Sequence, residues 1–190
     1  MGITSQASRT RRLMLAGVLA AFAVALIAGS ALAASTNLVK NGSFEKDGNG
    51  DGIPNNWDAF SLTPADKRVC NQSKAGDCSF KIVGTNTGKA LAQTNSAGGL
   101  STDEFTVSVW AKAKNMVNGA GYISIVIAFN HTGGGVNLVY LDIPEGNYGW
   151  TLYQTLAAAT EDYDSIEISL ASSIESGKVW VDKVKLVEAP

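Results

Sequence analysis

The side chains of this chain that could do chemistry are acidic residues, some aromatic rings, two cysteines and a single histidine. Two cysteines and His131 are too few ligands for a zinc site, and a histidine-based catalytic triad could use only His131. Hydrolysis by a pair of carboxyl groups needs the two groups to face each other across a cleft. The acidic clusters at 103–104 and 161–164 instead have the sequence context of solvated loops and strand starts. We therefore expect no catalytic residues and no enzyme activity.

The charge balance gives no sign of a nucleic-acid partner. The 190 residues contain 15 Lys and Arg against 17 Asp and Glu, a formal net charge of −2. Domains that bind nucleic acid usually carry a basic patch and a high isoelectric point. We therefore expect no nucleic-acid partner. The share of hydrophobic residues, 45%, and the presence of only four Pro favour an ordered domain.

The first 33 residues have the pattern of a secretion signal. Three arginines lie between residues 9 and 12, an apolar run covers residues 13–28, and Ala-Leu-Ala at 31–33 resembles a cleavage site. An uncleaved anchor is the alternative, because the apolar run approaches the roughly 20 residues that span a bilayer. We expect cleavage after Ala33, a secreted or cell-surface location, and no membrane contact of the remaining domain, residues 34–190.

The rest of the chain has the periodicity of β-strands. Apolar and polar residues alternate with a period of two in residues 105–111 and 165–170. Further strands are expected at residues 78–83, 122–129, 135–141 and 178–187, and the last of these alternates except at Trp180. Gly, Asn, Asp and Ser separate the strands. An alanine run within residues 155–160 could form one helical turn. The pattern predicts one all-β domain, a β-sandwich or jelly roll.

Cys70 and Cys78 are expected to form a disulfide. Export would place the pair in an oxidising compartment. A redox-active pair is the alternative, but the C-x-x-C spacing is absent. Closing so short a loop stabilises the fold by about 2–3 kcal/mol.

Both ends of the expected domain carry a recognisable pattern. Asn-Leu-Val-Lys-Asn-Gly-Ser-Phe-Glu stands at 37–45, Ile-Pro-Asn-Asn-Trp at 53–57, and Gly-Lys-Val-Trp-Val-Asp-Lys-Val-Lys-Leu at 177–186. With strands at 79–83 and 105–113, this pattern resembles the calcium-stapled jelly-roll carbohydrate-binding modules of the CenC-like superfamily. The resemblance implies a galactose-binding-domain-like jelly roll that binds a polysaccharide or oligosaccharide without catalysis.

The resemblance also implies a structural calcium ion. In the family, the Glu of the first element and the Asp of the last strand bind Ca²⁺ together with backbone carbonyls, and these positions are Glu45 and Asp182 here. Many members have a second acidic residue after this Asp, whereas this chain has Lys183. A buried carboxylate needs a cation or hydrogen-bond donors, which agrees with calcium binding by Asp182. The alternative is that Asp182 is exposed on the outer face of the sheet.

A second calcium loop is suggested by residues 47–58. Asp47, Asn49 and Asp51 take positions 1, 3 and 5 of such a loop, and Gly52 suits its sharp turn. Pro54 and the absence of flanking helix patterns depart from the motif. A solvated turn between two strands is the alternative, because Gly, Asn and Asp form turns readily. The sequence favours neither interpretation.

Trp110 is the best aromatic candidate for contact with a sugar. If Val107 and Val109 face the core, alternation turns Trp110 outward with Thr106 and Ser108. Four further residues could extend the same face of the sheet: Tyr122, Ser124, Asn137 and Tyr140. Two loop-edge aromatics, Tyr148 and Trp150, are an alternative, and burial is expected for the two tryptophans of the terminal patterns, Trp57 and Trp180.

A different class of function also fits the sequence. The domain could be a structural or adhesion protein of the cell surface or extracellular matrix that uses the jelly roll as a building block. Self-association through an exposed edge strand would support this alternative.

Overall fold

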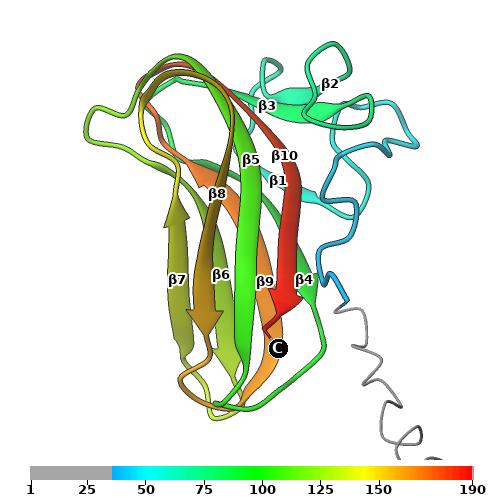
Figure 1. Cartoon of the computed structure of the whole chain (residues 1–190), viewed down its shortest axis with the longest axis vertical. Helices are drawn as coiled ribbons and strands as arrows, with labels where there is room; N and C mark the ends of the chain where they lie inside the picture. Colours follow the sequence, from blue (N-terminus) through cyan, green and yellow to red (C-terminus); the bar gives the residue numbers. More distant parts are fainter. Residues whose placement is uncertain (1–35, 190) are drawn as a thin grey trace, which may run out of the picture. The chain divides into compact units, whose positions relative to one another are not determined.

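This computed structural model describes residues 36–189, which contain ten β-strands joined by loops (Figure 1). They are β1 (Asp58–Phe60), β2 (Lys67–Val69), β3 (Ser79–Val83), β4 (Lys89–Asn95), β5 (Glu104–Val117), β6 (Ile123–His131), β7 (Val136–Asp142), β8 (Gly146–Ala158), β9 (Tyr163–Ser172) and β10 (Ser176–Glu188). The expected secretion signal, residues 1–33, lies outside the described residues. No helix within residues 36–189 is long and apolar enough to cross a membrane.

The strands form two antiparallel sheets. Sheet A has the strand order β2-β3-β10-β5-β8, and sheet B has the order β1-β4-β9-β6-β7. Strands that are far apart in the sequence, such as β4 and β9, therefore lie side by side (Figure 1). The inward side chains of both sheets form one buried hydrophobic cluster. This arrangement confirms the expected all-β sandwich.

Alternation along the strands decides which side chains enter the core. Val107 and Val109 of β5 are buried, as are Ile125 and Ile127 of β6, while the residues between them are more exposed. Successive side chains of a strand point to opposite faces, so one buried set leaves the other set on the outer surface. Burial of each large aliphatic side chain contributes about 1.5–3 kcal/mol to stability.

Besides the short strands β1 and β2, which the periodicity did not indicate, two segments differ from the sequence-based expectation. The alanine run at 155–160 forms no helical turn: β8 extends to Ala158, and Ala157 is buried opposite Phe105 of β5. Pairing with β5 therefore overrides the local helix preference of alanine. Strand β4 was not expected, because its inward side chains include Lys89 and Gln93, which are polar but buried.

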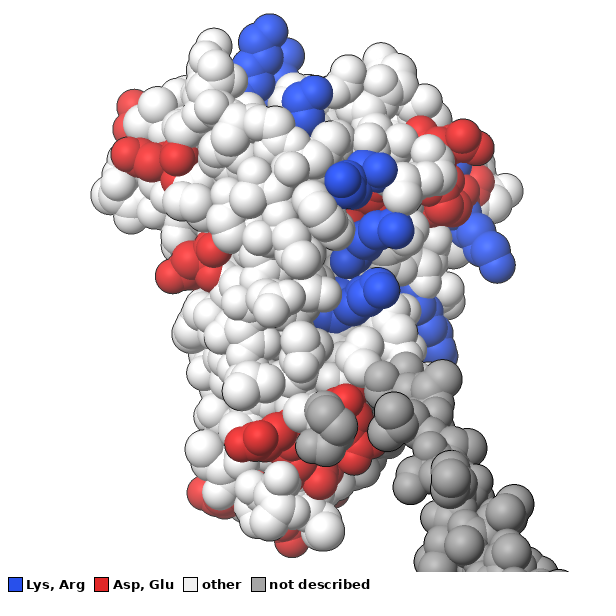
Figure 2. Space-filling model, viewed as in Figure 1, with Lys and Arg blue, Asp and Glu red and all other residues white. Residues whose placement is uncertain are grey.

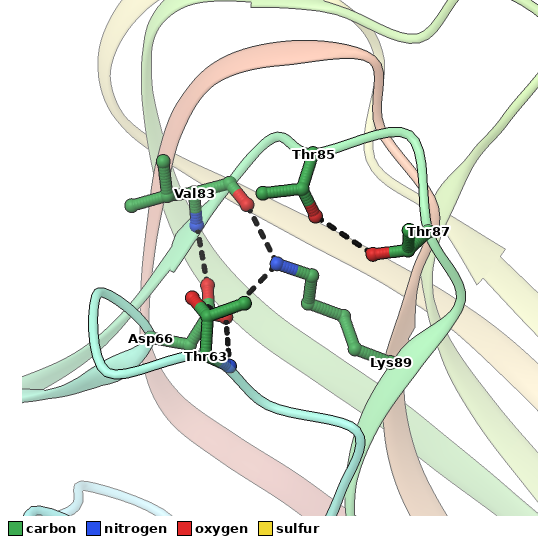
Figure 3. A network of polar contacts seen from close by, with 6 residues as sticks. All are labelled: Thr63, Asp66, Val83, Thr85, Thr87 and Lys89. Carbon is green, nitrogen blue, oxygen red and sulfur yellow. Dashed lines mark hydrogen bonds and ion pairs between the residues drawn. The ribbon is translucent and has the colours of Figure 1, made fainter.

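A buried ion pair connects the two sheets beside β4 (Figure 3). The Lys89 ammonium lies 2.9 Å from the Asp66 carboxylate and donates to the Val83 carbonyl at 2.8 Å. Asp66 also accepts from the Val83 amide at 2.7 Å and from the amide and hydroxyl of Thr63 at 2.8 and 2.7 Å. Val83 belongs to sheet A and Lys89 to sheet B. Burial alone would raise the pKa of Asp66, but the hydrogen bonds from Lys89, Val83 and Thr63 outweigh burial and lower it.

Replacement of Lys89 by Met is expected to destabilise the domain by about 3–5 kcal/mol, because it leaves the Asp66 carboxylate buried without its cation. The double variant Asp66→Asn with Lys89→Met should recover part of this loss. Since the pKa of Asp66 is lowered in the folded state, its contribution to stability is complete above the unfolded value of about 3.9 and is lost as the pH falls through the folded value.

Urea unfolding at several pH values measures both effects. Lys185→Met is the matched control, since Lys185 is exposed on β10. Equal unfolding free energies for the Lys89→Met and Lys185→Met variants would contradict this role of the ion pair.

Candidate functional site

The outer face of sheet B has mostly small side chains on its three central strands, called the low middle here, and larger side chains on its two edge strands. The outward side chains of its three central strands, β4, β9 and β6, are mostly small: Ala90, Ala92, Ser124, Val126, Ala128, Ser169 and Ala171. The edge strands carry larger side chains, and Phe60 on β1 and Tyr140 on β7 expose 56% and 51% of their surface. Leu138 of β7 is also exposed.

Strand register places the two edges on opposite sides of this low middle. One row across the five strands consists of Asp58, Ala92, Ser169, Val126 and Tyr140. The neighbouring row begins at Phe60 and ends at Asp142. With strands about 4.8 Å apart, the edges are separated by roughly 19 Å. The face can therefore accommodate an extended ligand between two aromatic edges.

Three carboxylates on the same face could bind hydroxyl groups. Asp58 lies on β1, Glu167 on β9 and Asp142 on β7, and all three are exposed. The Ser124 hydroxyl donates to Asp142 at 2.6 Å, which fixes one oxygen of that carboxylate. A carboxylate accepts hydrogen bonds through two oxygens, so each retains capacity for a ligand.

The residues expected to share one ligand-binding face lie on three surfaces. Val107 and Val109 are buried and Trp110 points outward as predicted, but β5 belongs to sheet A. Tyr140 lies on the outer face of sheet B, and the exposed Tyr122 directly precedes the first residue of β6. The single shared face was therefore a wrong prediction.

Asn137 is separated from Tyr140 by the alternation of β7. Asn137 points to the same side of β7 as Leu141, which is buried, whereas Tyr140 points to the other side and is exposed. In the orientation that satisfies both polar atoms, the Asn137 amide donates to the Ala158 carbonyl of β8 at 3.0 Å. Asn137 thus contacts the opposite sheet and does not join the outer face of sheet B.

Most of the tryptophans lie on or near sheet A. Trp57 is buried as expected, whereas Trp180 is only half-buried, between Lys81 and Lys112 in the register. The Lys74 ammonium lies 3.9 Å from the centre of the Trp110 ring. Tyr148 and Trp150 lie within β8 and not in a loop.

A disulfide-closed loop covers the two carboxylates expected to hold calcium. The bond between Cys70 and Cys78 is present as predicted. Asp182 is completely buried, so the alternative of an exposed Asp182 is wrong. Its carboxylate accepts from the amides of Lys74 at 2.8 Å, Ala75 at 3.1 Å and Lys183 at 2.6 Å.

Glu45 reaches the same loop from the other end of the described chain. It accepts from the amides of Asp77 at 3.1 Å and Cys78 at 3.3 Å. Burial raises the pKa of Asp182, the backbone amides partly oppose this shift, and the negative charge of Glu45 adds to it. No three Asp, Glu, His or Cys side chains converge on a metal-sized site in residues 36–189. Further ligands for a cation here would have to be backbone carbonyls, as in many calcium sites.

The loop of residues 47–52 is closed by its own hydrogen bonds. Asp47 accepts from the amides of Gly50 at 2.9 Å and Gly52 at 3.0 Å, and the Asn49 amide donates to Asp51 at 2.8 Å. These contacts are those of a turn. Cation binding by Asp47, Asn49 and Asp51 stays a prediction.

Comparison with known proteins identifies the fold. No family model matches the chain, and no curated protein matches it. A family 16 carbohydrate-binding module aligns with 80% of this chain and all of its own, at 17% identity and a TM-score of 0.61. A family 22 xylan-binding domain from Paenibacillus barcinonensis aligns with 81% of this chain and 95% of its own, at 14% identity and a TM-score of 0.58.

An enzymatic protein contains a similar fold. The enzymatically active domain of tailspike protein 4 from bacteriophage CBA120 aligns with 80% of this chain and 21% of its own, at 20% identity and a TM-score of 0.60. At these identities the likeness shows the fold alone. The fold is therefore a β-sandwich of the kind found in carbohydrate-binding modules.

Replacement of both cysteines by serine is expected to lower the unfolding free energy by about 2–3 kcal/mol, because the closed loop no longer restricts the unfolded chain. Urea unfolding of the oxidised wild type and of the Cys70→Ser, Cys78→Ser variant measures the difference. Adding reductant to the wild type should reproduce the loss and leave the variant unchanged. A variant as stable as the oxidised wild type would contradict this contribution.

Proposed function

We propose that this protein binds a neutral polysaccharide on the outer face of sheet B and has no catalytic role. The observation that carries the proposal is the low middle of small side chains between the aromatic edges at Phe60 and Tyr140. The similarity of the fold to carbohydrate-binding modules supports it. A rigid sheet face costs little ordering on binding, which favours affinity for an extended ligand.

The chemistry of binding divides between rings and carboxylates. Phe60, Tyr122 and Tyr140 would stack against the apolar faces of pyranose rings, since all three are exposed. Asp58 and Asp142 would accept hydrogen bonds from sugar hydroxyls. Export through the signal at residues 1–33 would bring the domain to polysaccharides outside the cell.

Calcium binding between Glu45 and Asp182 is part of the proposal. Both carboxylates accept from amides of the same disulfide-closed loop, and burial, with a smaller contribution from the charge of Glu45, raises the pKa of Asp182. A divalent cation would offset the repulsion between the two carboxylates. It would hold the loop against sheet A, with a stabilising role and no contact with the sugar.

One observation favours the alternative of a structural or adhesion protein. Strand β8 is a 13-residue edge strand of sheet A, and its Leu152 and Leu156 are exposed. Long apolar edges can pair with another chain. Sedimentation that gives a dimer or polymer, lost in a Leu152→Lys, Leu156→Lys variant, would favour this function.

Replacement of Tyr140 by Ala is expected to weaken polysaccharide binding about tenfold, equivalent to about 1.4 kcal/mol, because one stacking surface is lost. Affinity electrophoresis in gels containing xylan, β-1,4-galactan or glucomannan measures the retardation. Leu156→Ala is the matched control, since it removes an exposed apolar side chain from the other sheet. The absence of retardation of the wild type by every neutral polysaccharide would overturn the proposal.

Calcium at about 100 times its dissociation constant is expected to raise the melting temperature by about 5–10 °C, because a ligand that binds only the folded state stabilises by about 2.7 kcal/mol at that ratio. Thermal unfolding with Ca²⁺ and with chelator measures the shift. The variants Glu45→Gln and Asp182→Asn should lose it, and Glu104→Gln should keep it, since Glu104 is exposed on β5 and belongs to neither expected calcium site. Identical melting temperatures of the wild type under both conditions would remove the calcium proposal.

A further inference from the structure

The outer face of sheet A contains a basic groove. The groove has a volume of about 670 Å³ and lies over parts of β3, β10, β5 and β8. Four lysines line it: Lys81, Lys112, Lys114 and Lys178. Trp180 and Tyr148 supply its aromatic surface, and Gln72 and two asparagines its uncharged polar groups. No Asp or Glu is among the residues that line this groove in the described chain.

The strand register brings lysines directly opposite one another. Lys178 of β10 faces Lys114 of β5, and Lys67 of β2 faces Lys81 of β3. Trp180 stands between Lys81 and Lys112 in the same row. Like charges that are directly opposite on a sheet are destabilising. The facing lysines therefore lower the stability of the protein without ligand, and binding of an anion could restore it.

No carboxylate neutralises these lysines in the described chain. The two ion pairs there, Lys89 with Asp66 and His131 with Glu161, lie outside the groove. Lys112 donates to the neutral Gln72 amide oxygen at 2.7 Å. Burial lowers the pKa of Lys81, and the charges of Lys67 and Lys178 lower it further against the opposing charge of Asp66.

The distribution of charge limits what the groove can bind. Figure 2 shows Lys and Arg side chains gathered along the face that contains β5 and β10, with acidic side chains toward both ends of the molecule. The chain as a whole has a net charge of −2, so the rest of the surface does not attract an anion. The attraction is local, which suits a ligand whose carboxylates are spaced along a chain of otherwise neutral rings.

We propose that this groove binds an acidic polysaccharide rich in uronic acid, with sugar carboxylates on the lysines and one pyranose ring against Trp180. The Lys112 ammonium lies over the Trp180 ring, 5.7 Å from its centre, so a charge and an aromatic ring occupy the same part of the groove. The Tyr148 hydroxyl donates to the Pro144 carbonyl at 2.8 Å, which fixes a second aromatic ring at the edge of the groove. This site is on the opposite sheet from the proposed neutral-sugar face and does not depend on it.

Polygalacturonate and its fully methyl-esterified form are the probes, because they share one backbone and the methyl ester removes the charge of each carboxylate. Affinity electrophoresis without added Ca²⁺ should show retardation of the wild type by polygalacturonate alone, and the retardation should weaken as NaCl is added. The variant Lys114→Ala, Lys178→Ala should bind about tenfold more weakly, since it loses two charge-assisted contacts. Lys185→Ala is the matched control, because Lys185 is exposed on β10 but does not line the groove.

Thermal unfolding separates binding from folding. The Lys114→Ala, Lys178→Ala variant should melt no lower than the wild type, because it removes a pair of facing like charges. The Tyr140→Ala variant should bind polygalacturonate as tightly as the wild type does. A negative result for neutral sugars on sheet B would therefore not affect the test of the groove on sheet A.

Three results would overturn the inference. Equal retardation by the methyl-esterified polymer would show that charge is not recognised. An equal loss of polygalacturonate affinity in the Lys185→Ala variant and in the Lys114→Ala, Lys178→Ala variant would show that the polymer is attracted to positive charge in general and not to the groove. Tighter binding of single-stranded oligo-dT than of polygalacturonate would assign the groove to nucleic acid.

Discussion

Packing of the two sheets against each other is the constraint on which both candidate sites depend. The inward side chains of β5, β6, β9 and β10 fill one apolar core, and their burial fixes the outward set of every strand. Shifting a strand by one residue would exchange the two sets, so the core also maintains the ligand-facing surfaces. The ion pair of Lys89 with Asp66 reinforces this arrangement, because it joins β3 and β4 of opposite sheets through Val83.

The two outer faces differ in chemistry although they belong to one sandwich. Sheet B presents small side chains between Phe60 and Tyr140, with single carboxylates beside them. Sheet A presents facing lysines around Trp180. Sheet B therefore suits neutral sugars, because stacking dominates on that face, and sheet A suits acidic sugars, because charge dominates there. The disulfide-closed loop over Asp182 borders the groove of sheet A, to which it contributes Gln72, and it organises the region between Glu45 and β10.

Local periodicity was enough to predict the sandwich and the outward direction of Trp110, since alternation is a property of a single strand. It could not reveal that Trp110 and Tyr140 lie in different sheets, because sheet membership depends on pairing between distant strands. The lysines of sheet A were missed for the same reason: Lys114 and Lys178 are 64 positions apart and face each other only through the register. One local signal was available, because Trp180 interrupted the alternation of residues 178–187.

Side-chain NMR during titration with a sugar shows whether a neutral glycan occupies the outer face of sheet B. Xylohexaose, cellohexaose and galactotriose are suitable ligands, and Phe60, Tyr140, Trp110 and Trp180 are the reporters. We expect at least one sugar to shift the ring signals of Phe60 and Tyr140 to saturation and to leave both indole signals unchanged. Saturable shifts confined to Trp110 and Trp180, or no shift with any of the three sugars, would contradict it.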